Sequence, residues 1–318
     1  MTTAQSSAWC RLVIWSRKPS AASNSSSISW NATFRADMAD TAANLHFPIL
    51  DDIARDLAGD VNFPTCLDAA VLVRNTLKDP FAELAQVAKV ISVEPLICSK
   101  LLRMANSIAY NPYGREVTDV ATAVSRLGFD VVRTTSLAVA LDQMLKSRNL
   151  RAYEPLAKQV WEHSIQVAAI ARVLARRLGR VNPDEALLAG LVHDIGIFYL
   201  LYRAADYPVY QNDPDAVQAL LVGWHESIGE NLLHALGMPA TIIDAVRDHD
   251  QPSNVETPCT VKDMIYFANL LASRDATEIP GTPLAPDTPR QQQDRERYAD
   301  LLAEAADDIA QLQHALAG

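Results

Sequence analysis

The spacing of apolar residues is the feature that most constrains the fold of this chain. From about residue 40 onward they recur every three or four positions, as in FAELAQVAKVIS, where Leu84, Val87 and Ile91 share one face. The next segment, EPLICSKLLRMANSIAY, repeats the pattern with Pro95 in its first turn, where a missing N–H is harmless. No alternating pattern of convincing length predicts a strand. The sequence therefore predicts an all-α fold.

Length, charge and cysteine content exclude several classes of protein. The 318 residues suffice for one large domain or two smaller ones, and 49% are hydrophobic, which excludes a disordered chain. The net charge of −10 argues against a nucleic-acid binder with a broad basic surface. The four scattered cysteines form no CxxC pair and predict free thiols in a reducing cytosol. Because no apolar run reaches the roughly 18–20 residues of a membrane span, we expect a cytoplasmic protein with neither a membrane nor a nucleic-acid partner.

Both ends of the chain differ in composition from its centre. Residues 1–37 are Ser-rich, with no acid before Asp37, and we expect a flexible extension or an over-called start. Residues 276–318 combine a Pro-rich linker, centred on PGTPLAPDTPR (280–290), with a C-terminal amphipathic helix. That helix is expected to fold back on the body or to bind a partner. Its predicted apolar stripe consists of Tyr298, Leu302, Ala305, Ile309, Leu312 and Leu316.

The run LLAGLVHDIGIFYL places a histidine and a carboxylate side by side in an apolar setting. Asp194 is the one formally charged side chain between Ala186 and Tyr202. An unpaired carboxylate in apolar surroundings costs several kcal/mol, so it must face water or have a partner, either a metal or another side chain. We expect His193 and Asp194 in the middle of a helix, about 100° apart. On a continuous helix, both side chains can reach one site only if that site lies beside the helix, between the two directions, or if Asp194 bridges two metal centres.

Four histidines share helical faces with apolar residues and are therefore expected to point inward. They are His163, His193, His225 and His249. The last is expected on a helix that continues to Pro252. One such histidine is more often a satisfied core residue than a ligand, but four of them with a lone carboxylate favour a convergent polar site. Imidazole and carboxylate suit Fe, Mn, Zn or Ni, although a hydrogen-bonded cluster without metal stays an open alternative.

The order of these residues resembles the His…His-Asp…His…His succession of HD-superfamily phosphohydrolases. It is carried by EHSIQVAAIARVLA, LLAGLVHDIGIFYL and WHESIGENLLHALGMPATIIDAVRDHDQP. The upstream segments NFPTCLDAAVLVRNTLKDP, VAKVISVEPLICSKLLRMANSIAYNP and VTDVATAVSRLGFDVVRTTSLAVAL resemble the HDOD family, an HD-related output domain of bacterial signalling proteins. The likeness covers roughly residues 60–272. It implies an N-terminal helical subdomain (38–150) packed on an HD-like helical bundle (151–275).

The resemblance also implies a ligand set and shows two departures from it. The matching metal ligands are His163, His193, Asp194, His225 and His249. Where HD hydrolases carry a late Asp, the stretch MIYFANLLAS offers Asn269, whose neutral amide is a much weaker ligand. Where related cyclic-dinucleotide phosphodiesterases carry two adjacent histidines and a Gly-Tyr-Pro signature, RDHDQP has one histidine and the chain has no GYP. That particular activity is therefore not expected.

Three functions follow as alternatives, and we favour the first. It is an HDOD-type regulatory domain of bacterial signal transduction, non-catalytic and acting through protein–protein contacts, with a vestigial cluster or a structural ion. The second is a divalent-metal-dependent phosphohydrolase of a nucleotide or phosphodiester, with Arg133 or Arg247 on the phosphate. The third is a ligand-sensing or nucleic-acid-linked regulator, suggested by a helix-turn-helix-like segment with Lys100 and Arg103. Protein partners in a signalling pathway and a nucleotide ligand are the expected interactions.

Overall fold

The computed structural model describes residues 45–58, 68–77, 83–108, 110–236, 238–247, 249–251, 253, 255–272 and 287–316. These residues form helices and connecting turns, with no strand among them, which confirms the predicted all-α class. The chain divides into two compact units, Met1–Asp52 and Ile53–Gly318, and the candidate site lies wholly in the second. The expected extension, 1–37, lies outside the described residues. The expected boundaries near residues 150 and 275 stay predictions.

The helices follow one another without an intervening element of another kind in the described part. In chain order they are α3 (Phe47–Ala58), α4 (Asp68–Leu77), α5 (Leu84–Ser92), α6 (Pro95–Ala105), α7 (Val120–Leu145), the 3-10 helix η2 (Asn149–Tyr153), α8 (Glu154–Leu178), α9 (Pro183–Val192), α10 (Ile195–Ala204), α11 (Pro208–Gln211), α12 (Pro214–Ala235), α13 (Ala240–Val246), α14 (Val261–Leu271), α16 (Pro289–Arg297) and α17 (Ala299–Leu316).

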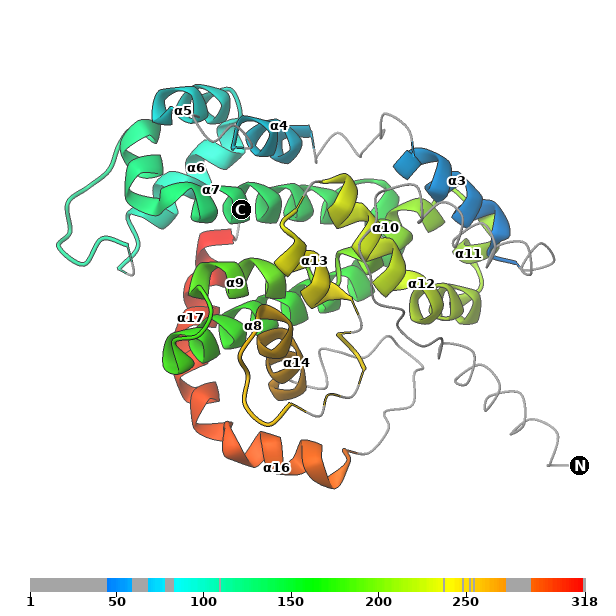
Figure 1. The fold of residues 1–318 in the computed structure, drawn as a ribbon. Coiled ribbons are helices and arrows are strands. Elements are labelled where there is room, and N and C mark those ends of the chain that lie inside the picture. Colours follow the sequence, from blue (N-terminus) through cyan, green and yellow to red (C-terminus); the bar gives the residue numbers. More distant parts are fainter. Residues whose placement is uncertain are drawn as a thin grey trace, which may run out of the picture. The chain divides into compact units, whose positions relative to one another are not determined.

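The N-terminal helical subdomain is formed by α4, α5, α6 and α7 (Figure 1). Their buried side chains form a largely aliphatic core. Pro95 begins α6 as predicted. Gly128 interrupts α7 with φ 79° and ψ 165°, so the expected break between two helices is a kink there. A positive φ of this kind suits glycine, which has no Cβ. The second helix of the helix-turn-helix-like pair buries Lys100, which is only 3% exposed.

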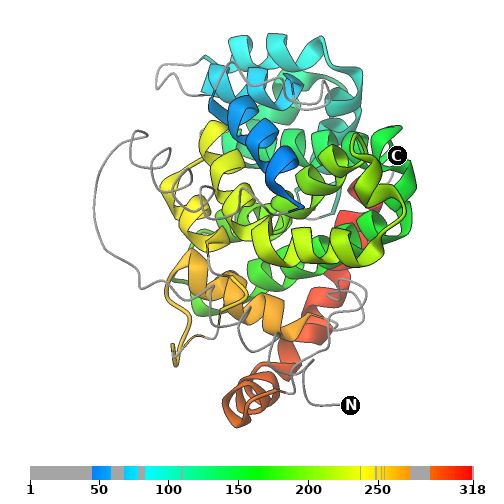
Figure 2. The ribbon, with the colours of Figure 1, turned by 90° about the vertical axis from the view of Figure 1, so that its right-hand side faces the viewer.

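The HD-like bundle is centred on α8 and α9, with α10 against α12 and α13 against α14 (Figures 1 and 2). Asn182 caps α9 by accepting from the Asp184 amide, and Pro183 follows at the first helical position. Two glycines allow the backbones to approach closely. A Cβ on Gly190 would lie 2.5 Å from the Cα of Ala168, and a Cβ on Gly196 would collide with the His225 carbonyl oxygen. These contacts set the spacing of the helices around the site.

Within the described residues, one segment has the length and hydropathy of a membrane span. It is Pro183–Ala204, with 22 residues and a mean hydropathy of 1.4 in its most apolar window. The expectation that no segment reaches that length was therefore wrong. However, 89% of this window is buried inside the protein, and the segment is split into α9 and α10. Its apolar residues thus form the centre of the bundle.

The C-terminal helix α17 folds back along α8, one of the two outcomes expected for it. The predicted apolar stripe was wrong at Leu302, which is 40% exposed while Leu301 is buried instead, and the side chain of Leu316 lies outside the described part of the chain. The cause is a break at Tyr298, where α16 ends and α17 starts afresh. The predicted linker is also shorter than expected, since Pro289 already begins α16.

Candidate metal centre

The five predicted ligands come from four different places in the bundle and meet in its interior. His163 lies on α8, His193 and Asp194 between α9 and α10, His225 on α12, and His249 just after α13. None of the five is more than 7% exposed. The structure thus brings all of them together, while His234, interpreted as a surface residue, has a half-exposed side chain.

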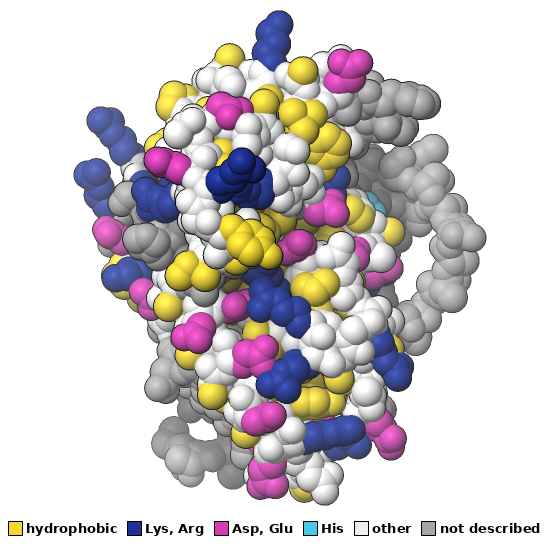
Figure 3. Space-filling view, turned by 90° about the vertical axis from the view of Figure 1, so that its left-hand side faces the viewer, with side chains coloured by type: hydrophobic (Ala, Val, Ile, Leu, Met, Phe, Trp, Pro, Cys, Tyr) yellow, Lys and Arg dark blue, Asp and Glu magenta, His cyan; other side chains and the backbone are white. Residues whose placement is uncertain are grey.

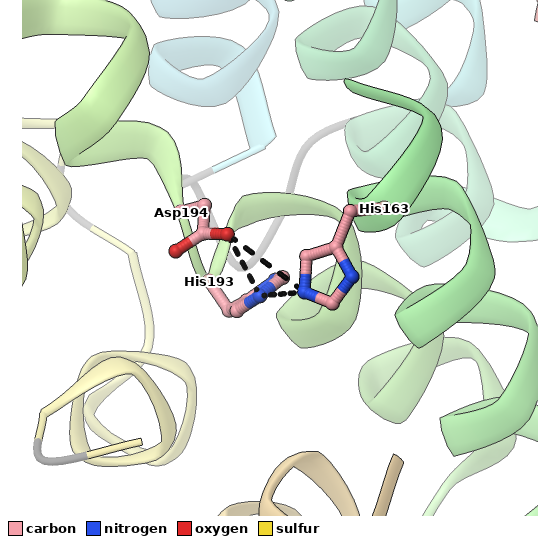
Figure 4. A group of neighbouring side chains, drawn as sticks. All are labelled: His163, His193 and Asp194. Carbon is pink, nitrogen blue, oxygen red and sulfur yellow. Dashed lines mark hydrogen bonds and ion pairs between the residues drawn. The ribbon is translucent and has the colours of Figure 1, made fainter. Parts of the chain in front are cut away.

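His193 and Asp194 do not lie in the middle of a helix, contrary to our expectation. His193 is the C-cap of α9, and Asp194 is the N-cap of α10, with φ −100° and ψ 18°. The break removes the difficulty of two neighbours that project 100° apart on one helix. Figure 4 shows both side chains turned toward His163. The apolar run is therefore two short core helices joined at the polar pair.

His249 also lies outside the helix predicted to carry it. Helix α13 ends at Val246, because Arg247 has extended backbone angles of φ −65° and ψ 128°. The helix is thus shorter than the one expected to reach Pro252. The imidazole is nevertheless buried, and its Nδ1 lies 2.8 Å from the Val246 carbonyl oxygen. Helical periodicity predicted the burial of His249 correctly but its backbone wrongly.

Three of the histidines are oriented by the same device. Nδ1 of His193, His225 and His249 lies 2.8–2.9 Å from a main-chain carbonyl oxygen three or four residues earlier. A carbonyl oxygen only accepts, so in each ring Nδ1 donates and Nε2 is left to face the site. Metal-binding histidines are commonly held in this way by a hydrogen bond from the second ring nitrogen.

The Nε2 atoms of His163 and His193 face one oxygen of Asp194 (Figure 4), and the Nε2 atom of His249 faces the other. His193 Nε2 lies 3.1 Å from Oδ2 and 3.2 Å from His163 Nε2, and His163 Nε2 lies 3.9 Å from Oδ2. On the other side, His249 Nε2 lies 3.2 Å from Oδ1. Two groups of potential ligands therefore share Asp194, namely His163–His193–Asp194 and Asp194–His225–His249, each with ligand atoms within 4.8 Å of one another. The carboxylate bridges two groups of histidines.

A third group, which the sequence analysis missed, lies closer to solvent. His225, Glu226 and Asp250 also bring ligand atoms within 4.8 Å of one another. The Asp250 side chain is 51% exposed, whereas His225 is buried, and His225 Nε2 lies 3.3 Å from Asp250 Oδ2. Both acids directly follow a predicted ligand in sequence, and this adjacency was the signal that could have identified them.

Asn269 faces the outer group rather than Asp194. Its Nδ2 donates to Asp250 Oδ1 at 3.2 Å. The neutral amide is a much weaker metal ligand than the carboxylate of an aspartate, and its NH2 group is here committed to Asp250. The position where HD hydrolases carry a carboxylate is therefore occupied here by a group that holds Asp250.

The charge states of the buried groups depend on one another. Burial, with His193 beside it, lowers the pKa of His163 to about 4. Burial alone would raise the pKa of the Asp194 carboxyl, but His193 and His249 outweigh it and hold that pKa well below its usual range. Burial would likewise lower the pKa of His249, but Asp250 and the hydrogen bond to Asp194 raise it to about 10. Without metal, His249 is thus the cation that neutralises Asp194.

The donor set fits a divalent metal ion. Imidazole nitrogens and carboxylates are the ligands of Zn, Mn, Fe and Ni sites. His225 Nε2 is a buried ring nitrogen that faces Asp250 Oδ2 at 3.3 Å, and His193 Nε2 and His163 Nε2 face each other. All the ion-pair partners of Asp194 in the described chain are histidines. The two arginines considered as phosphate contacts are engaged elsewhere, Arg133 with Asp130 and Arg247 with Glu230 and Asp244.

Comparison with known families identifies one match over most of the described bundle. The family described as HDOD domain matches residues 63–252. This range contains all five predicted ligands and ends before α14, α16 and α17.

Individual relatives and solved structures agree with the fold. Ribonuclease Y of Deinococcus radiodurans is 32% identical over 126 residues, which are 38% of this chain and 19% of that protein. A candidate metal-dependent phosphohydrolase of Shewanella amazonensis is similar in structure, with a TM-score of 0.63, 22% identity, and coverage of 86% of this chain and 98% of that one. A candidate signal transduction protein of Marinobacter aquaeolei has a TM-score of 0.54 and 21% identity, over 89% of this chain and 69% of that one. The chain thus spans about a fifth of the ribonuclease.

Proposed function

Because the chain belongs to the HDOD domain family, we propose that it is a regulatory domain of bacterial signal transduction that binds a divalent metal ion and acts through protein contacts without hydrolysis. The proposal places it in the cytoplasm with a protein partner, and a nucleotide is the candidate small ligand. The metal would be held by His163, His193, Asp194, His225 and His249, in a stabilising role.

The observation that carries the non-catalytic part of this proposal is the contact of Asn269. HD hydrolases carry an aspartate at this position. Here the neutral Asn269 donates to Asp250, so this position adds no negative charge to the cluster around Asp194. Within the described chain, Asp194 and Asp250 make their ion pairs only with histidines. No arginine or lysine of the described chain pairs with these acids.

The metal-binding part rests on pre-organisation. In three imidazoles, a hydrogen bond from Nδ1 to a main-chain carbonyl already directs Nε2 into the site, and Asp194 already lies between two of these rings. Little conformational entropy is therefore lost when an ion binds. Such an ion supplies Lewis acidity when bound, and the residues around it exclude water by their burial. In a regulatory domain its effect would be to join α8, α9, α12 and the segment after α13.

The test combines metal analysis with hydrolysis assays on the whole chain. We expect purified protein to contain a stoichiometric divalent metal ion, and Asp194→Asn to abolish it. We expect metal-loaded protein to show no turnover of bis-p-nitrophenyl phosphate, nucleotides or single-stranded RNA above the level of Asp194→Asn. Turnover by the wild type that disappears in Asp194→Asn would overturn the non-catalytic assignment.

One observation favours a second candidate, a metal-dependent phosphodiester hydrolase. The outer group of His225, Glu226 and Asp250 gives the buried cluster a half-exposed carboxylate that substrate could reach. The similarity to a ribonuclease and the likeness to a candidate phosphohydrolase point the same way. Glu226 is the residue to test for this function. Burial raises the pKa of its carboxyl, and a raised pKa suits a group that transfers protons during hydrolysis. A loss of turnover in Glu226→Gln with unchanged metal content would support the hydrolase.

A further inference from the structure

Helix α17 lies along α8 but outside the region that matches the family, which ends at residue 252 (Figures 1 and 2). Its sequence, ADLLAEAADDIAQLQHAL, carries four acids and no lysine or arginine. The end of α8 that it covers carries Arg172, Arg176 and Arg177. The two helices are therefore complementary in charge along their contact.

The contact consists of a narrow apolar seam with an ionic row beside it. Where side chains of α17 are described, Leu301, Ala305 and Leu312 are the buried apolar ones. Beside them, Arg177 Nε donates to Glu304 at 2.7 Å, and Arg176 NH1 lies 3.1 Å from Asp308 Oδ2. Basic and acidic side chains interleave over the lower part of the face in Figure 3. A short apolar seam with acids at i and i+4 is the pattern of an amphipathic ligand helix.

The ionic row is not fully satisfied where it enters the interior. Arg172 Nε is buried without a hydrogen bond, and Arg172 NH1 lies 3.9 Å from Asp308 Oδ2, which has its shorter ion pair with Arg176 NH1 at 3.1 Å. Buried polar atoms without partners reduce the stability of a contact. The other pairs are partly exposed, with Arg177 at 55% and Glu304 at 37% exposure, so salt screens them. This contact can therefore exchange more readily than the glycine-packed contact of α8 with α9.

One of these arginines, Arg172, also contacts α9, the helix whose C-cap is His193. Arg172 NH2 lies 2.7 Å from the Tyr110 hydroxyl and 3.3 Å from Asp184 Oδ1. Asp184 lies in the first turn of α9, and His193 caps the other end of that helix. Whatever occupies the α8 surface thus contacts a side chain that also holds α9.

We propose that Arg172, Arg176 and Arg177 of α8 form a docking site for an acidic amphipathic helix of a partner protein, and that α17 occupies this site as a displaceable intramolecular ligand. The partner helix carries carboxylates four residues apart beside an apolar seam, as Glu304 and Asp308 do in α17. The assignment is independent of whether the His/Asp cluster binds metal.

The test uses the full chain with one charge reversal on α17 and a matched control next to it. Asp308→Arg repels Arg176, whereas Asp307→Arg makes the same change at an exposed position. Hydrogen exchange should show α17 amides exchanging about tenfold faster in Asp308→Arg than in wild type or Asp307→Arg, while α8 and α9 amides keep their protection. Adding Arg176→Glu to Asp308→Arg should restore the protection of α17.

The docking site itself is probed with a labelled peptide of residues 299–316. We expect it to bind Asp308→Arg about tenfold more tightly than wild type, and more weakly as NaCl rises from about 0.1 to about 1 M. The Asp308→Arg/Arg177→Glu chain should lose that binding. If the amides of α17 exchange at the same rate as those of α9 in every variant, α17 does not open separately from the bundle, and the proposal is overturned. So would equal peptide binding to all variants, or dimerisation of Asp308→Arg, which would identify a second copy as the occupant.

Discussion

Helix α8 has two different kinds of neighbour, and the contrast between them separates the fixed part of this protein from the exchangeable part. Against α9, the backbones touch at Gly190 and Ala168 and nearly every side chain is buried. Against α17, a short apolar seam is flanked by ion pairs that are open to solvent. The first contact places His163 opposite His193, and the second places arginines opposite carboxylates.

This difference shows how one helix can serve both a rigid site and a reversible contact. Close packing holds the imidazole rings in the positions that metal coordination requires, because a dense interior resists small displacements. Ion pairs between exposed side chains contribute little and weaken with salt. We therefore expect changes on the α9 side to cost much more stability than changes on the α17 side.

The largest effect is expected from the charge at the centre of the packed side. Asp194→Asn removes the negative charge that faces His193 and His249, so the buried His249 imidazolium loses the nearer of its two carboxylate partners and keeps only Asp250 at 3.6 Å. We expect the free energy of unfolding to fall by about 3–5 kcal/mol in metal-free protein, measured by urea denaturation. The matched control is Asp130→Asn, which affects an exposed pair with Arg133 and should change it by less than about 0.5 kcal/mol. Equal effects of the two would mean that Asp194 is solvated.

The next effect tests the backbone approach of α10 and α12. Gly196→Ala places a Cβ against the carbonyl oxygen of His225, so we expect a loss of about 2–3 kcal/mol in the free energy of unfolding. Gly223→Ala in α12 meets open space and should gain about 0.5–1 kcal/mol, because alanine favours the helix. A neutral Gly196→Ala would show that the spacing of these helices is adjustable.

A pH titration of metal-free protein distinguishes the histidines of the centre. The folded pKa of His163, about 4, lies below the ordinary 6.5, so the unfolded chain binds more protons and stability rises with pH between about 4 and 6.5. The folded pKa of His249, about 10, lies above 6.5, so its contribution is complete below pH 6.5 and is lost as pH rises toward 10. Each group contributes a slope of up to about 1.4 kcal/mol per pH unit. Thermal unfolding should thus show maximal stability near pH 6.5, and a steady rise up to pH 9 would contradict these assignments.

The smallest effect is expected on the α17 side. Arg177→Gln removes an exposed ion pair with Glu304 and should lower the free energy of unfolding by less than about 1 kcal/mol. Because salt already screens that pair, the difference from wild type should shrink further in 1 M NaCl. A loss as large as that of Gly196→Ala would show that α17 belongs to the fixed core.

Much of the fold was predictable because local periodicity and capping determine where helices lie. The cap at Asn182–Pro183, the kink at Gly128 and the buried faces of His163 and His225 all follow from short-range rules. Periodicity was misleading where tertiary contacts end a helix early, as at His193–Asp194 and after Val246. An apolar run looks continuous in sequence, although its polar pair turns the backbone to reach a shared site.

The sequence predicted the five buried residues of the candidate site but not the two acids of the outer group, Glu226 and Asp250. The five buried ligands follow from polar residues on apolar faces and from the family resemblance. Glu226, in the middle of α12, and Asp250, after α13, were missed because charged side chains usually face solvent. The proximity of Asp250 to His225 depends on how α12 packs against the segment after α13, which no local pattern encodes. The hydrogen bond from Asn269 to Asp250 is likewise a product of tertiary packing.

The most direct test of the account is a calorimetric titration of metal-free protein with Zn²⁺ at pH 7 in two buffers of different ionisation enthalpy. At this pH, His249 is protonated in the folded protein, because its pKa is about 10. Binding through its Nε2 must displace that proton. The account predicts saturable binding with release of about one proton, and no such binding by Asp194→Asn. Equal binding by wild type and Asp194→Asn, or no heat of binding in either buffer, would contradict it.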